Sequence, residues 1–275
     1  MRIRIVDAFT DRPFAGNPAG VLLLDTDAFP DDDRLQRIAA EVNLSETAFA
    51  HPLPEGAEAD WALRWFTPAT EVKMCGHATL ATAHVLHTTG AATGTVRFAT
   101  LSGVLPTTAD DSGTITLDFP ASQLTPLDVA QDTTGVADAL GGVRILSLHH
   151  TTPYIDHLFV EVADEATVRT LSPDLAALAQ TGHRGCIVTA AAEDPARGYD
   201  FVSRVFAPAV GIDEDPVTGS AHTALAPFWS ARLGRTELTG FQASARGGLV
   251  RTALRGDRTL LTGTAVTVID GELLA

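Results

Sequence analysis

The feature that most constrains the fold of this chain is an internal repeat at about half its length. Three pairs of short segments match in the same order: 64–69 with 204–209, 76–81 with 219–224, and 102–105 with 247–250. The offsets are 140, 143 and 145 residues, so the second half carries small insertions. Three ordered pairs favour a duplication over chance. Two similar domains predict a ligand site in the cleft between them.

The expected secondary structure repeats in the same way. Alternating or apolar segments predict strands in both halves: 2–8, 21–24, 45–50, 62–66, 96–98, 103–106, 114–119, 145–148, 157–162, 185–189 and 199–206. Each half also contains one helix of small and apolar residues, at about 76–88 and about 220–232. Such helices are buried on most sides. We therefore predict an α+β fold of two pseudo-symmetric domains, each a curved, barrel-like mixed β-sheet wrapped around a central α-helix.

The connections between these elements give further expectations. Residues 14–20 are rich in Gly and Pro and predict a turn-rich loop. Asp31 is a suitable cap for a helix that carries Leu35 and Ile38 on its apolar face, and a second helix is expected at 173–180. We place the two domains at 1–122, completed by the last C-terminal strand, and at 123–275.

The charge balance excludes several classes of partner. The 275 residues include 19 Lys and Arg against 34 Asp and Glu, a formal net charge of −15. A nucleic-acid-binding protein needs a basic surface to meet phosphates, and so does a protein that adheres to anionic membranes. We therefore expect neither kind of partner.

Cofactor signals are missing from the sequence. Lys73 is the single lysine, which leaves pyridoxal phosphate only one attachment point. No Gly-Lys-Ser/Thr triplet and no Gly-x-Gly-x-x-Gly after a strand is present, so neither a P-loop nor a dinucleotide fold is expected. The histidines at 84, 87, 149 and 150 lack the spacing and company of a metal site. We expect no cofactor and no metal.

The cellular compartment is inferred from the cysteines and the N-terminus. Cys75 and Cys186 are far apart and form no disulfide framework. The first residues interrupt their apolar side chains with charges, unlike a signal peptide, and the longest apolar runs are too short to span a bilayer. A cytoplasmic protein with reduced thiols is expected.

Glu46 is the first candidate for chemistry. It lies among the apolar residues Leu44, Ala48 and Phe49. A carboxylate in an apolar pocket has a raised pKa and can exchange protons near neutral pH. The alternative is a glutamate that faces outward on an alternating strand. The local sequence alone favours the alternative.

The starts of the two small-residue helices are the second candidate. Gly76 and His77 begin the first, and Gly219 and Ser220 begin the second. Backbone N–H groups at a helix start bind carboxylates or oxyanions. Three acids, Asp213 to Asp215, directly precede the second helix. They are either ordinary helix-start acids or an acid/base group for the cleft. His77 could equally be a capping or core histidine.

An ordered set of motifs now resembles a known family. The motifs are DAFT (7–10), GNPA (16–19), LSETAF (44–49), CGHAT (75–79), EDPVTGSA (214–221) and RGG (246–248). Together they extend over essentially the whole chain and resemble the PhzF-like (phenazine-biosynthesis) family. This family shares the fold of diaminopimelate epimerase, which agrees with the repeat. Its best-characterised member isomerises trans-2,3-dihydro-3-hydroxyanthranilate without a cofactor.

The resemblance implies roles for particular residues. Glu46 falls on the acid/base glutamate of the family, and His77 and Asp215 fall on further catalytic positions. The remaining matched positions, expected to bind a small carboxylic acid substrate, are Asn17, Ser45, Gly76, Thr218, Gly219 and Ser220. A homodimer is also implied. The physiological substrate is not encoded in any motif.

Cys75 separates this chain from thiol-dependent epimerases. Such enzymes use one cysteine from each half as a pair of bases. Cys75 matches the first position, but the second is Thr218, whose hydroxyl is far too weakly acidic to replace a thiolate. We therefore expect a cofactor-independent isomerase that shifts a proton through Glu46. The alternatives are an amino-acid epimerase, racemase or lyase on the same scaffold, or a non-catalytic metabolite-binding protein.

Overall fold

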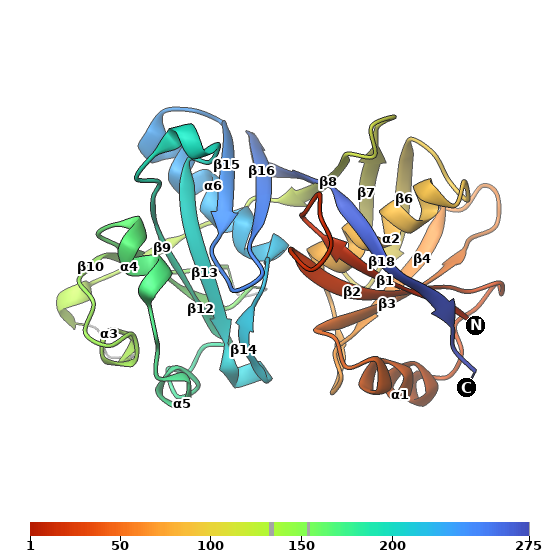
Figure 1. Cartoon of the computed structure of the whole chain (residues 1–275), viewed down its shortest axis with the longest axis horizontal. Helices are drawn as coiled ribbons and strands as arrows, with labels where there is room; N and C mark the ends of the chain where they lie inside the picture. Colours follow the sequence, from red (N-terminus) through yellow and green to blue (C-terminus); the bar gives the residue numbers. More distant parts are fainter. Residues whose placement is uncertain (132–134, 153–154, 275) are drawn as a thin grey trace. The chain divides into compact units, whose positions relative to one another are not determined.

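The computed structural model describes residues 1–131, 135–152 and 155–274. The chain divides into two compact units (Figure 1). Unit 1 comprises Met1–Phe119 and the final segment that begins at Leu260, and unit 2 comprises Pro120–Thr259. The boundary expected from the sequence is at 122.

Unit 1 is built on a mixed sheet with strands from both ends of the chain. Its strands are β1 (Arg2–Ala8), β2 (Asn17–Leu23), β3 (Glu46–Pro52), β4 (Trp61–Phe66), β5 (Glu71–Val72), β6 (Thr95–Thr100), β7 (Gly103–Ala109), β8 (Ile115–Pro120), β17 (Arg258–Gly263) and β18 (Ala265–Glu272). Neighbours follow the order β18–β1–β2–β3–β4–β6–β7–β8. The pairs β2–β3 and β4–β6 are parallel and the others are antiparallel. β5 adds to β4, and β17 adds to β8.

Helix α2 (Gly76–Thr88) forms the centre of unit 1. It packs against β1, β2, β3 and β7, and every residue from Gly76 to Ala83 is buried. The small side chains of this helix let the strands approach closely. Gly263 of β17 lies close to this helix, because an added Cβ would lie 3.4 Å from Leu80 Cδ1.

Unit 2 has its own mixed sheet and its own central helix. The strands are β9 (Thr125–Leu127), β10 (Ile145–His150), β11 (His157–Val162), β12 (Gly185–Ala191), β13 (Phe201–Ala207), β14 (Ile212–Asp215), β15 (Glu237–Gln242) and β16 (Gly248–Arg255). Neighbours follow the order β9–β10–β11–β12–β13–β15–β16, with β11–β12 and β13–β15 parallel. Helix α6 (Gly219–Leu233) packs against β15 and β16.

The strand pairing confirms the duplication. The series β1–β2–β3–β4–β6–β7 of unit 1 and the series β10–β11–β12–β13–β15–β16 of unit 2 have parallel pairs at the same two places. The short strands β5 and β14 occupy matching positions before α2 and α6. Both units are therefore copies of one topological plan.

A repeated ion pair joins the two strands that precede each central helix, β4 to β5 and β13 to β14. Arg64 donates from Nε and Nη2 to the carboxylate of Glu71, at 2.6 and 2.8 Å. Arg204 donates in the same way to Glu214, at 2.7 and 3.0 Å. Each guanidinium also lies over the phenylalanine two residues later in the chain, at about 5 Å from the ring centre. Glu214 therefore pairs with Arg204 as Glu71 pairs with Arg64.

The other helices are short, except for α1. They are α1 (Asp32–Val42), α3 (Val136–Ala139), α4 (Glu165–Thr170) and α5 (Leu175–Leu178), with 3₁₀ turns at Val129–Gln131, Pro195–Arg197 and Pro208–Val210. The predicted cap of α1 is confirmed, because Asp31 Oδ1 accepts from the backbone N–H of Arg34 at 2.9 Å. Among the described residues, no helix combines the length and apolar character needed to cross a membrane.

Two local predictions were wrong. Residues 17–20 belong to β2 rather than to a loop. Gly20 is small for packing reasons, since an added Cβ would lie 3.0 Å from Thr47 Oγ1. The helix expected at 173–180 is only the single turn of α5, and α4 was not predicted. Asp174 caps α5 through the N–H of Ala177, but no apolar face extends beyond Leu178.

Candidate active site

The pair Glu46 and His77 is the centre of the predicted site in unit 1. Glu46 is the first residue of β3, and His77 is the second residue of α2. The two meet because α2 packs on β3. His77 Nε2 lies 3.3 Å from Glu46 Oε2, and the two side chains are only 4% and 13% exposed. Glu46 therefore points into the unit rather than outward, against the alternative that its local sequence favoured.

Two polar neighbours set the orientation of the His77 ring. Ser45 Oγ donates to Asn17 Oδ1 at 3.2 Å, and the Asn17 amide nitrogen lies 3.2 Å from His77 Nδ1. Because the amide oxygen accepts from Ser45, the amide N–H₂ group donates to Nδ1. The ring proton is then on Nε2, where it faces Glu46.

Burial keeps this imidazole neutral. Removal of His77 from water lowers its pKa to about 3. The 3.3 Å contact with Glu46 is thus an approach of a neutral imidazole to a carboxylate rather than an ion pair. At neutral pH His77 cannot serve as an imidazolium acid.

Cys75 lies directly before α2 and close to the same ring. It is the N-cap residue of the helix, and its Sγ lies 3.5 Å from His77 Nδ1. Glu46, Cys75 and His77 each contribute one ligand atom to a cluster in which all three atoms lie within 4.8 Å of one another. Sequence reasoning did not find this cluster, because Glu46 is distant in sequence and reaches the helix start only through the packing of α2 on β3.

The corresponding region of unit 2 contains oxygen groups. Thr218 is the N-cap residue of α6, and its Oγ1 donates to Asp215 Oδ2 at 2.5 Å. Ser220 is the second residue of the helix, which is the place of His77 in α2. At these two helix starts, neither the side chain of Cys75 nor that of Thr218 forms a hydrogen bond that caps its own helix. Of the three acids before α6, Asp213 is exposed and Glu214 is bound to Arg204, which leaves Asp215 beside the helix start.

Gln242 is a residue that the sequence analysis missed. It is fully buried on β15 and accepts from the backbone N–H of Thr218 at 2.8 Å. Its amide N–H₂ group donates to the carbonyl of Asp215 and to Thr218 Oγ1, at 2.6 and 3.1 Å. Gln242 thereby fixes the segment from Asp215 to Thr218. The one sequence signal that could have identified Gln242 is its position four residues before the motif at 246–248.

The nine predicted site residues therefore form two groups. Unit 1 brings together the side chains of Asn17, Ser45, Glu46 and His77 at the start of α2, which Gly76 begins. Unit 2 brings Asp215 and Thr218 to the start of α6, where Gly219 and Ser220 are the first two residues. Within each unit, residues from separate motifs lie at the N-terminal end of the central helix.

Comparison with known proteins gives consistent matches over the full chain. A family model described as phenazine biosynthesis-like protein (PhzC-PhzF) matches residues 6–271. An uncharacterized isomerase of Halalkalibacterium halodurans is 44% identical over 275 residues, which covers 99% of this chain and 98% of the relative. A crystal structure of a PhzF-family phenazine biosynthesis protein from Enterococcus faecalis has a TM-score of 0.88 at 39% identity, and covers 100% and 99% of the two chains.

A more distant structure shows how far the fold extends. A predicted epimerase from Pseudomonas aeruginosa has a TM-score of 0.78 at 20% identity, and covers 100% and 99% of the two chains, a likeness that shows the fold alone. The predicted α+β, diaminopimelate epimerase-like fold class is confirmed. The relatives support an isomerase-like or epimerase-like function at a general level. On the extent of the family match and the identity to its members, this chain belongs to the phenazine biosynthesis-like (PhzC-PhzF) family.

Proposed function

We propose that this protein is a cofactor-independent isomerase in which Glu46 is the acid/base group. The observation that carries the proposal is the 3.3 Å contact between Glu46 Oε2 and His77 Nε2. Burial keeps the His77 imidazole neutral, so no full positive charge from this ring lies beside the Glu46 carboxylate. The Glu46 side chain is 13% exposed, which leaves it reachable by a ligand.

The proposed reaction is a proton shift on one molecule. Glu46 accepts a proton from a carbon beside a π-system, and the electron pair of the broken C–H bond enters that system. The protonated carboxyl group then returns the proton to a different carbon of the same system. Substrate and product are isomers, so the step needs neither an oxidant nor a reductant.

The substrate class follows from the helix starts. N–H groups at the beginning of a helix, together with its dipole, stabilise an anion. We assign the start of α2, at Gly76, to the carboxylate of a small carboxylic acid, and on the family resemblance alone we give the start of α6, at Gly219, a role in substrate binding. In this assignment Asn17 and Ser45 position His77, while Thr218 and Ser220 contribute hydroxyl groups to the substrate.

Asp215 is the proposed second polar group of the reaction. Its carboxylate accepts from Thr218 at 2.5 Å, and Gln242 holds its backbone. The assignment to the same substrate as Glu46 rests on the family resemblance and on the equivalence of the two helix starts. We propose that Asp215 stabilises charge or transfers a proton after Glu46 has removed the first one.

An epimerase is the second candidate, because Cys75 Sγ lies 3.5 Å from His77 Nδ1 at the position of a thiol base. The equivalent N-cap residue in unit 2 is Thr218, which offers no thiolate. A pair of cysteine bases is therefore absent from these two N-cap positions. Epimerisation would need Glu46 and a second base of another kind.

The experiment that tests the proposal begins with a ligand. A thermal-shift screen of small carboxylic acids identifies molecules that bind, and each is then incubated with enzyme in deuterium oxide. An isomerase exchanges solvent deuterium into its ligand, whereas a binding protein does not. Glu46→Gln should lower exchange by a factor on the order of 10²–10⁴ while ligand binding persists in calorimetry.

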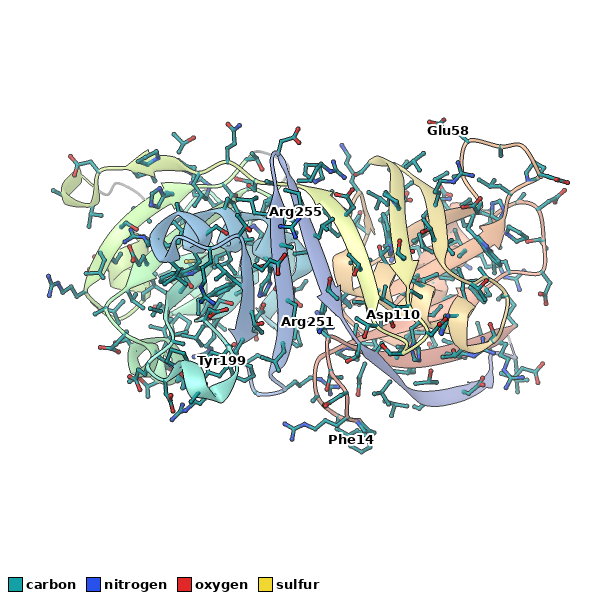
Figure 2. The ribbon with its side chains drawn as sticks, turned by 90° about the horizontal axis from the view of Figure 1, so that it is seen from above. Phe14, Glu58, Asp110, Tyr199, Arg251 and Arg255 are labelled. Atoms are coloured by element: carbon teal, nitrogen blue, oxygen red, sulfur yellow. The ribbon has the colours of Figure 1, made fainter. Side chains whose placement is uncertain are left out.

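The matched control is Glu58→Gln on an exposed loop of unit 1 (Figure 2). It makes the same chemical change away from α2 and should leave exchange unaltered. Exchange at the wild-type rate in Glu46→Gln would remove Glu46 from the mechanism. Loss of binding together with exchange would show that Glu46 anchors the ligand.

A further inference from the structure

The cluster of Glu46, Cys75 and His77 has the composition of a metal site that the isomerase reaction does not use. We propose that these three residues bind one thiophilic divalent cation, such as Zn²⁺, and that the bound cation inhibits the enzyme. The metal-binding part stands on the geometry of the cluster. The inhibitory part rests on the proposed function, because it needs Glu46 to be the acid/base group.

The three side chains lie close enough together to surround one small cation. In a zinc site, bonds of about 2.0–2.3 Å place neighbouring ligand atoms about 3.3–3.7 Å apart. Cys75 Sγ lies 3.5 Å from His77 Nδ1, Glu46 Oε2 lies 3.3 Å from His77 Nε2, and one ligand atom from each residue lies within 4.8 Å of the others. Because the two shorter distances are to different ring nitrogens, a rotation of the His77 or Glu46 side chain would bring the three ligand atoms around one cation. The thiolate, one imidazole nitrogen and one carboxylate oxygen would be the protein ligands, and water would take the fourth position. All three side chains are held on α2 and β3 before a metal arrives.

The charges of these ligands match a divalent cation in a buried place. A thiolate and a carboxylate together carry two negative charges, and a neutral imidazole adds none. The complex with Zn²⁺ is therefore neutral, which limits the cost of burying it. The thiol proton leaves to solvent when the metal binds. Cys75 is 6% exposed, so the metal would enter beside the more accessible Glu46.

The equivalent position in unit 2 should not bind the same metals. There the N-cap is Thr218, the next polar side chain is Ser220, and the carboxylate is Asp215. These groups offer oxygen alone, whereas thiolate and imidazole select Zn²⁺ and related cations. We expect one equivalent of metal per chain, held in unit 1.

The direct experiment is a titration of the full-length, chelator-treated protein with Co²⁺ and then Zn²⁺. Cobalt bound to a thiolate gives a charge-transfer absorption in the near ultraviolet. One equivalent should produce that band, and Zn²⁺ should abolish it. Cys75→Ala should lose the band and weaken Zn²⁺ binding by at least about 100-fold. Cys186→Ala, which removes the other buried thiol, should behave like the wild type.

Three results would overturn the metal site. They are no band at one equivalent, a band that survives in Cys75→Ala, and a band that disappears in a folded Cys186→Ala. Circular dichroism of each variant confirms that it is folded. A folded Glu46→Gln variant should keep the thiolate band but bind Co²⁺ more weakly, and unchanged affinity would remove the carboxylate from the site.

Inhibition is scored within each variant, as deuterium exchange with Zn²⁺ divided by exchange without it. Wild type and Cys186→Ala should lose at least about 90% of exchange at saturating Zn²⁺, because the metal occupies the acid/base carboxylate. Stoichiometric binding without inhibition would overturn the inhibitory part. A metal-free wild type that catalyses no exchange would count against the proposed function, while the cobalt band would still report the site.

Discussion

The starts of α2 and α6 occupy equivalent places in two units that share one pattern of strand pairing. In unit 1 the N-cap residue is Cys75 and the second helical residue is His77. In unit 2 the same places hold Thr218 and Ser220. The duplicated backbone supplies N–H groups at both helix starts, whereas sulfur and nitrogen side chains occur in unit 1 and hydroxyl groups in unit 2. The scaffold is thus repeated, and the side-chain chemistry is not.

The carboxylates differ between the units in a similar way. Glu46 is the first residue of β3, and Gly185 is the first residue of β12. Conversely, Asp215 pairs with Val205 on β13, where Val72 pairs with Trp65 on β4. Each unit therefore has a carboxylate at a position where its counterpart has none. The two units therefore carry different groups at equivalent backbone positions, which is consistent with the proposed reaction with one principal base.

The largest expected effect distinguishes these two carboxylates. Glu46→Gln should lose a factor on the order of 10²–10⁴ in both turnover and deuterium exchange, since the base that breaks the C–H bond is gone. Asp215→Asn should lose turnover but keep most of the exchange, because Glu46 can still remove the first proton. Turnover and exchange are followed by NMR on one sample. Loss of exchange in Asp215→Asn alone would reverse the two roles.

The next largest effect is on the free energy of unfolding and concerns Gly185, the counterpart of Glu46 in unit 2. At Gly185 an added Cβ would lie 2.5 Å from the carbonyl oxygen of Phe206 and 2.8 Å from His157 Nε2. Because a backbone atom must move, Gly185→Ala should lower the free energy of unfolding by roughly 2–4 kcal/mol. Gly271→Ala on β18 is the control, since nothing lies within 4 Å of its added Cβ. Equal urea midpoints for the two variants would contradict the crowding.

The third effect is a pH dependence at the start of α6. His222 Nδ1–H donates to the carbonyl of Thr218 at 2.8 Å, and burial lowers the pKa of His222 to about 4. The unfolded chain binds this proton near pH 6.5, so the stabilisation is complete above that value and is lost as the pH falls from 6.5 to 4. The counterpart Thr79 makes the same contact in α2, to Cys75 at 2.6 Å, without a titrating group.

His222→Asn tests this difference because an amide keeps the N–H donor but does not titrate. The free energy of unfolding of the variant should fall less steeply between pH 6.5 and 4, by up to about 3 kcal/mol. Urea titrations at several pH values measure the slope. A slope identical to that of the wild type would mean that His222 titrates normally in the folded protein.

The sequence predicted the fold well because the duplication is visible in short segments. The matches around Arg64 and Arg204 indicate strands. The runs of small and apolar residues after Gly76 and Gly219 indicate helices that are buried on most sides. Helix α4 was missed because its first residue, Glu165, is 1% exposed and accepts from Tyr199 and Arg169. A pattern search treats glutamate as a surface residue and cannot anticipate such partners.

The site was only partly predictable for a related reason. The family motifs identified the side chains, but the local sequence of Glu46 favoured an exposed strand residue. Its contact with His77 depends on the packing of α2 on β3, which no local pattern encodes. The role of Gln242 is tertiary in the same sense, since β15 is brought to the start of α6 by pairing with β13.

The smallest effect is expected from substitutions that make the N-cap of α2 resemble that of α6. Cys75→Ala and Cys75→Thr remove the thiol, and Cys75→Thr copies the residue that precedes α6. Turnover should stay within about 3-fold of the wild type, because Glu46 remains beside His77 and the thiol is not the base. Thiol alkylation of the wild type should inhibit by blocking access, and the Cys75 variants should resist it. If Cys75→Ala were as inactive as Glu46→Gln, the thiol would be a base, and the two helix starts would have to be compared as the paired groups of an epimerase.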